Sequence, residues 1–142
     1  MKYMLDTNIC SYIIKQRPLS VLEKLKTVPI EECGISSITL AELRYWVGKN
    51  KRLHQKSRNT GKPNINEEVI DKFVSHLNIA QFDSLAADAY GDIRAELEQN
   101  GTLIGSEDLF IAAHAVSMNS ILVTNNIKEF ENVPNLIIEN WL

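Results

Sequence analysis

The sequence is poor in cysteine, in proline and in long apolar runs. Its two cysteines lie in different segments without a CxxC pair, so we expect Cys10 and Cys33 to be free thiols rather than a disulfide or a zinc site. No stretch approaches the roughly 20 apolar residues of a membrane-spanning helix. The residues after Met1 have no signal-peptide pattern. These absences predict a cytoplasmic protein that does not enter a membrane.

Basic side chains are scarce except in one segment. The chain has 15 Lys and Arg against 18 Asp and Glu, which gives a net charge of -3. Six of the basic residues lie in KNKRLHQKSRNTGK (49–62), which has no acid, so nine basic residues face eighteen acidic ones elsewhere. A basic segment on an acidic body indicates a polyanionic partner, although a solvated loop also explains a run of like charge.

Apolar residues make up 44% of the 142 residues, enough for one sizeable core, so we expect residues 1–142 to form a single domain. Short apolar segments predict strands at 2–6, 33–37, 78–82, 120–126 and 136–142. Helical spacing and caps predict helices at 8–16, 18–26, from Thr39 towards the basic segment, 66–77, 84–99 and 106–118. This alternation predicts an α/β fold of three layers, with a short, mostly parallel sheet of four to five strands.

Polar residues follow the predicted strands. Asp6 ends the first, Ser36 and Ser37 the second, and Thr124 to Asn126 the fourth. Ligands of open parallel sheets bind beyond the carboxyl ends of the strands, so this edge is the expected site. Asp6 directly follows a buried strand, and a buried carboxylate without a partner costs several kcal/mol. A partner from outside the sequence, a cation, would relieve this cost.

Three further acids stand at comparable positions: Glu42, Asp108 and Glu129. Clustered carboxylates without a basic partner repel each other, and Mg²⁺ or Mn²⁺, which prefer oxygen ligands, would neutralise them. The three histidines show no short ligand spacing, which argues against zinc. His114 lies in an apolar run and is expected to be a buried, hydrogen-bonded side chain.

Each acid also has a purely structural interpretation. The segment TLAE (39–42) fits a capping box in which Glu42 reaches back to the Thr39 amide. Asp108 lies in the first turn of a predicted helix, where the dipole favours any negative charge. Its neighbour Glu107 is expected to be exposed. Asp6 has the weakest structural alternative, because Thr7 or Asn8 could equally cap the first helix.

Four segments carry a resemblance to a known family: MLDTNI (4–9), ITLAEL (38–43), IGSEDLFIAAHA (104–115) and LVTNNIKEF (122–130). In this order, across nearly the whole length, they resemble PIN-domain ribonucleases of the VapC type, the toxins of type II toxin-antitoxin systems. The resemblance implies a Mg²⁺- or Mn²⁺-dependent endoribonuclease, usually a homodimer, that a cognate antitoxin protein inhibits. It also suggests tRNA as the substrate.

The resemblance assigns roles to individual residues. Asp6, Glu42 and Asp108 match the catalytic acids that bind metal, and Thr7 and Thr124 match polar residues that orient them. The fourth acidic position of many PIN domains falls at Asn126, which cannot carry charge, so Glu129 one helical turn later would substitute. One firmly held ion is therefore expected, with a second arriving with substrate. The RNA-binding residues expected in the basic segment are Lys51, Arg52, Lys56 and Arg58.

Two other functions compete with this one. A phosphatase of the haloacid dehalogenase type needs DxD after the first strand, where this chain has Asp6-Thr7-Asn8. The uncharged Asn126 leaves open an inactive scaffold that binds a partner protein. Binding of Mg²⁺ or Mn²⁺ would separate a nuclease from such a scaffold.

Overall fold

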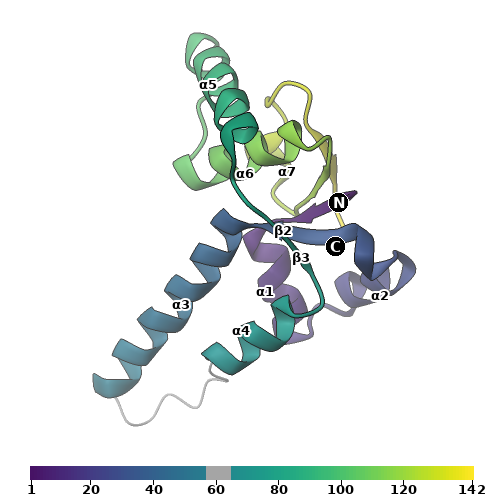
Figure 1. The fold of residues 1–142 in the computed structure, drawn as a ribbon, viewed down its shortest axis with the longest axis vertical. Helices are drawn as coiled ribbons and strands as arrows, with labels where there is room; N and C mark the ends of the chain where they lie inside the picture. The colour runs from purple at the N-terminus through teal and green to yellow at the C-terminus, as the bar shows by residue number, and fades with distance from the viewer. Residues whose placement is uncertain (57–64) are drawn as a thin grey trace.

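A single five-stranded sheet lies at the centre of the protein (Figure 1). The computed structural model describes residues 1–56 and 65–142, with side chains described for 1–53 and 65–142. Every neighbouring pair of strands is parallel, in the order β3-β2-β1-β4-β5. The strands are β1 (Tyr3–Leu5), β2 (Cys33–Ser36), β3 (Asn78–Ala80), β4 (Ile121–Val123) and β5 (Ile137–Glu139).

Helices cover both faces of the sheet, which confirms the predicted three-layer α/β/α fold. One layer holds α1 (Thr7–Lys15), α2 (Leu19–Thr27), α3 (Ser37–Lys56) and α4 (Glu67–Val74). The other holds α5 (Ser84–Gln99), α6 (Ser106–Ser117) and the short α7 (Ile127–Phe130). Figure 1 shows α3 extending away from the sheet beside α1 and α4, with α5, α6 and α7 grouped on the opposite side.

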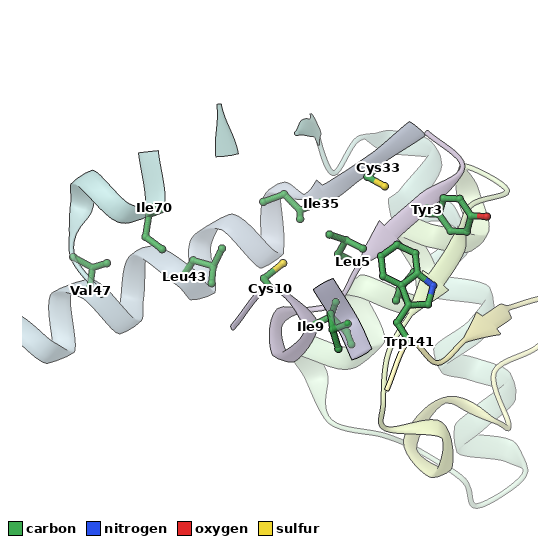
Figure 2. Packing of buried hydrophobic residues seen from close by; sticks show 12 residues of the cluster. Tyr3, Leu5, Ile9, Cys10, Cys33, Ile35, Leu43, Val47, Ile70 and Trp141 are labelled. Carbon is green, nitrogen blue, oxygen red and sulfur yellow. The ribbon is translucent and has the colours of Figure 1, made fainter. Parts of the chain in front are cut away.

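The alternation of side chains along β1 divides the core in two. Leu5 points into a cluster with Ile9 of α1 and Leu43 of α3 (Figure 2). Met4 points to the opposite face and joins a cluster formed by α5, α6, β4 and α7, which includes Phe130. Successive residues of a strand face opposite sides of the sheet, so three strand residues suffice to anchor both layers.

The predicted elements exist, but several boundaries differ. Helix α3 begins at Ser37, two residues before the predicted Thr39, and α4 ends at Val74 rather than Leu77. The strands are shorter than predicted. At the end of β2 the Ser36 hydroxyl accepts a hydrogen bond from the Ile38 amide at 3.0 Å, so the chain enters α3 directly after the strand. Two short elements had no prediction, α7 and a 3₁₀ helix at Ile30–Glu32.

Two of the expected absences concern the cysteines and the membrane. Cys10 and Cys33 are both buried free thiols, as predicted. Within residues 1–56 and 65–142, no helix is both long enough and apolar enough to cross a membrane.

Candidate active site

The candidate site lies where the direction of strand order reverses. The chain proceeds from β1 outward to β2 and β3, and then returns to place β4 on the other side of β1. The carboxyl ends of β1 and β4 are therefore neighbours, and the Asp6 amide donates a hydrogen bond to the Val123 carbonyl at 3.0 Å. Ligands of open α/β sheets bind in the crevice at such a reversal. Asp6 and Thr124, the residues after these two strands, lie side by side at this edge of the sheet.

Asp6 is both buried and the N-cap of α1. Its side chain is only 5% exposed, and Oδ1 accepts a hydrogen bond from the Ile9 amide at 2.8 Å. The prediction that Thr7 or Asn8 caps this helix is therefore wrong: the chain turns immediately after β1, and its extended backbone sets Asp6 over the first-turn amides. Burial raises the pKa of Asp6, and hydrogen bonds from Thr124 and from the Ile9 and Asn8 amides oppose that rise. Thr7, the first helical residue, is half-buried.

Glu42 does not form the predicted capping box. Because α3 begins at Ser37, Thr39 lies inside the helix, is fully buried, and its hydroxyl has no hydrogen-bond partner in the described part of the chain. Glu42 faces α6 instead. Burial, a hydrogen bond and the charge of Glu107, and the charge of Asp108 raise the pKa of Glu42 to about 7. The capping interpretation of this acid is excluded by its geometry.

Asp108 and Glu129 form a second pair of acids. Asp108 lies in the first turn of α6 and Glu129 in α7, and the Gly105 amide donates a hydrogen bond to Glu129 Oε1 at 3.1 Å. Burial, together with the charges of Glu129, Asp6 and Glu107 and a hydrogen bond with Glu129, raises the pKa of Asp108 to about 6. Asp108 thus interacts with Glu129 of α7, with Asp6 at the end of β1 and with its own neighbour Glu107.

Glu107 belongs to this group, although the sequence indicated only an exposed neighbour of Asp108. It is exposed, as predicted, yet its carboxyl group shares a hydrogen bond with Glu42. One of two hydrogen-bonded carboxyl groups must carry a proton unless a cation lies between them. Two adjacent acids at the start of a helix were the signal in the sequence, but only the packing of α3 against α6 shows which residues they face.

The donor set fits a hard divalent cation. Five acids gather around this edge of the sheet: Asp6 after β1, Glu42 on α3, Glu107 and Asp108 on α6, and Glu129 on α7. None of them has an ion pair with a basic residue in the described ranges. No three described Asp, Glu, His or Cys side chains converge as ready-made metal ligands; the acids meet in pairs. Mg²⁺ commonly binds through one or two carboxylates and keeps several waters, which suits paired carboxylates.

Known proteins resemble this chain over nearly its whole length. The PIN domain family model matches residues 3–136. The chain belongs to the PIN-domain family. Ribonuclease VapC2 of Rickettsia felis is 47% identical to this PIN domain over 142 residues, covering 99% of this chain and 98% of the relative. A tRNA(fMet)-specific endonuclease VapC of Salmonella typhimurium is 42% identical over 141 residues, covering 99% and 98%.

A solved structure shares the whole architecture of this PIN domain. The VapBC2 complex of Rickettsia felis, bound to a DNA fragment from its promoter, contains a chain that matches with a TM-score of 0.84 and 46% identity, covering 100% of both chains. Together with the similarity of the full-length relatives, this agreement assigns the chain to the VapC group of the family.

A buried histidine connects helix α6 to the end of strand β2. His114 is 1% exposed, and its Nδ1 lies 2.7 Å from the Ser36 hydroxyl at the end of β2, which confirms the predicted buried, hydrogen-bonded role. Burial lowers its pKa, while the charge of Asp83 and a hydrogen bond with the Gln81 backbone oppose that change. The contact fixes α6, which carries Asp108, against the strand that leads into α3.

The remaining residues singled out in the sequence lie around this centre. Asn126 is exposed and precedes α7, and its amide donates to the Thr124 hydroxyl at 3.0 Å. Lys51 and Arg52 are exposed on the last turns of α3. The backbone of Lys56 ends that helix, its side chain being outside the described ones, and Arg58 lies outside the described residues.

Proposed function

We propose that this PIN domain is a Mg²⁺- or Mn²⁺-dependent endoribonuclease that acts as the toxin of a toxin-antitoxin system. The observation that supports the proposal is the position of Asp108, whose charge acts on Glu42 and which is itself acted on by the charge of Asp6, without an ion pair to a basic residue among the described residues. Similarity to proteins named as ribonucleases supports the choice of RNA as substrate. We further propose that residues 1–142 act as a single cytoplasmic domain.

In the proposed mechanism the acids hold the reaction centre. Asp6 and Asp108 would bind the ion, with Thr124 orienting the Asp6 carboxylate through its hydroxyl. A bound divalent ion lowers the pKa of a coordinated water and polarises the phosphate. Glu42, with its raised pKa and its hydrogen bond to Glu107, would order the attacking water or take part in a second ion site. Glu129 would take the fourth acidic role in place of the uncharged Asn126. Hydrolysis of this kind leaves a 5′-phosphate and a 3′-hydroxyl.

The identity of the RNA and of the protein partners is part of the same proposal. The Salmonella relative bears the name of a tRNA(fMet)-specific endonuclease, and this supports tRNA as the substrate here. Solved relatives are VapBC complexes, and VapBC is a family of toxin-antitoxin systems, which supports a cognate antitoxin. A homodimer remains a prediction from the resemblance.

The proposal is tested by incubating the purified protein with tRNA and with total RNA. Cleavage is expected with Mn²⁺ or Mg²⁺ and should stop when EDTA is added and resume when the ion is restored. Mapping of the new 5′ ends should find discrete sites that bear 5′-phosphates. Cleavage that persists in EDTA, or ends with 2′,3′-cyclic phosphates, would contradict a metal-dependent hydrolysis.

A scaffold without catalytic activity would give a different pattern. The exposed, uncharged Asn126 and the absence of three convergent ligands among the described residues are the observations in its favour. Such a protein would cut no RNA under any of these conditions, and calorimetry would show no binding of Mg²⁺ or Mn²⁺. Metal binding together with cleavage would exclude it.

We predict that the basic segment contributes affinity without sequence preference. Replacing Lys51, Arg52, Lys56 and Arg58 by Gln should weaken binding of unrelated RNAs to a similar extent. It should also reduce the slope of log affinity against log salt by up to about 0.7 for each phosphate of a single strand that these side chains neutralise. Filter binding in EDTA at several salt concentrations measures both. An unchanged slope would assign these residues to a solvated loop.

A further inference from the structure

A hollow of about 480 Å³ lies between α1 and α3. Its lining combines two aromatic rings, two lysines and two amides with one serine, Ser11, and two aliphatic side chains, Leu53 and Ile65. From α1 come Asn8, Tyr12 and Lys15, and from α3 come Trp46, Lys49 and Asn50. The catalytic proposal uses none of these six residues.

Both helices that line the hollow begin close to acids of the candidate site. On α1, Asn8 lies two residues after Asp6. On α3, Trp46 lies four residues after Glu42, so both side chains belong to the same helix face. At the strand edge, Asn125 Nδ2 donates a hydrogen bond to the Tyr12 hydroxyl at 3.1 Å. A chain bound in the hollow would therefore lie about one helical turn from Glu42 and beside the segment that follows β4.

The lining matches the chemistry of a single-stranded nucleic acid. Lys15 and Lys49 are exposed and have no ion pair within the described part of the chain, and no acid lines the hollow. Free lysines attract phosphates. Trp46 and Tyr12 are half-buried, so each keeps part of its ring accessible for stacking with a base. The amides of Asn8 and Asn50 add donors and acceptors for base edges.

We propose that this hollow binds an unpaired nucleotide of the RNA substrate, next to the phosphate that is cut. The inference rests on the proposed ribonuclease function and adds to it the place where an unpaired base of the substrate would bind. A base would stack against Trp46 or Tyr12, while Lys15 and Lys49 contact the flanking phosphates. Paired RNA keeps its bases stacked within the helix and cannot supply such a base, so the hollow favours loops and ends.

The two tryptophans of the chain provide a built-in assay. Trp46 lines the hollow and is half-buried, whereas Trp141 is only 3% exposed and packs against Tyr3. An oligouridylate of about ten nucleotides, titrated in EDTA, should quench the emission of Trp46, because a stacked base lies against its ring. Trp46→Phe leaves Trp141 as the remaining emitter and should abolish the quenching. An RNA duplex should quench far less.

Affinity measurements with the same labelled oligouridylate extend the test. Trp46→Leu should weaken binding about tenfold, and Trp46→Phe should restore most of it, because a ring can still stack. Lys15→Gln with Lys49→Gln should lower the salt slope by about 1.4, since each phosphate neutralised in a single strand contributes about 0.7. The matched control is Lys26→Gln with Lys72→Gln, two exposed lysines outside the hollow, which should leave the slope unchanged.

The outcomes separate this inference from the catalytic proposal. Metal-dependent cleavage by a protein whose Trp46 emission does not respond to oligouridylate would overturn the inference and leave the nuclease intact. Quenching in a protein that cuts no RNA would support the hollow as a binding site and overturn the nuclease. Equal quenching by oligoglutamate would assign the hollow to acidic protein segments and overturn the inference. Equal quenching by duplex RNA would overturn the requirement for an unpaired base.

Discussion

Asp108→Asn is expected to reduce RNA cleavage at least about a hundredfold, more than the 10- to 100-fold typical of groups that only support metal ligands. Asparagine keeps the size of the side chain but removes the charge that would bind the ion. Asp6→Asn should have the same effect, because its carboxylate lies at the neighbouring strand end. The measurement is the initial rate of cleavage of a labelled tRNA in Mn²⁺.

The stability of the variants decides whether the loss is chemical. The pKa of Asp108 is raised from 3.8 to about 6 by burial and by neighbouring acids, so its ionisation lowers stability as the pH rises between these values, and the full cost is present above about pH 6. Removing that charge should leave the melting temperature of the metal-free protein unchanged or higher at pH 7.5. Asp92→Asn, on the exposed face of α5, is the matched control and should cut RNA normally. Near-normal cleavage by Asp108→Asn would refute its assignment as a metal ligand.

Phe130→Ala should cost about 3–5 kcal/mol of unfolding free energy, a large part of the 5–15 kcal/mol typical of a domain. Phe130 is 1% exposed and belongs to the core cluster that includes Met4 and Leu122. Its removal would leave a cavity under α7, which the surrounding helices and strand cannot fill without shifting. Urea unfolding followed by circular dichroism measures the change.

A neighbouring residue supplies the control for this prediction. Ile127 lies on the same short helix but is 38% exposed, so Ile127→Ala should cost less than about 1 kcal/mol. Because Glu129 adjoins Phe130, Phe130→Ala should also weaken metal binding at temperatures where the protein remains folded. Equal costs for the two substitutions would show that Phe130 does not anchor α7.

The sequence predicted the fold well because period and composition act locally. Each strand is a short apolar run, and the alternating helical segments are long enough for the crossovers that parallel pairing needs, so the pattern predicted the sheet. The location of Asp6 followed as well, since it ends a strand. The roles of Asp6, Glu42 and Asp108 remain predictions that the variants above would test.

What the sequence could not provide depends on contacts between distant segments. Whether Glu42 caps its own helix or faces α6 depends on where α3 begins. The Ser36 hydroxyl binds the Ile38 amide and α3 begins at Ser37, but in the sequence Ser36 and Ser37 are equally typical of the end of a strand. The contact of Glu107 with Glu42 likewise requires the packing of two helices. Helix α7 was missed because four residues carry too little periodicity to indicate a helix.

The strand order also determines when the parts of the candidate site are present together during synthesis. Strand β1 and Asp6 leave the ribosome first, but the neighbour that completes the crevice is β4, which is translated after α6. Until then the nascent chain lacks Thr124 and Glu129, so the candidate site is incomplete. The candidate site therefore cannot form before β4, close to the end of the chain, has been translated.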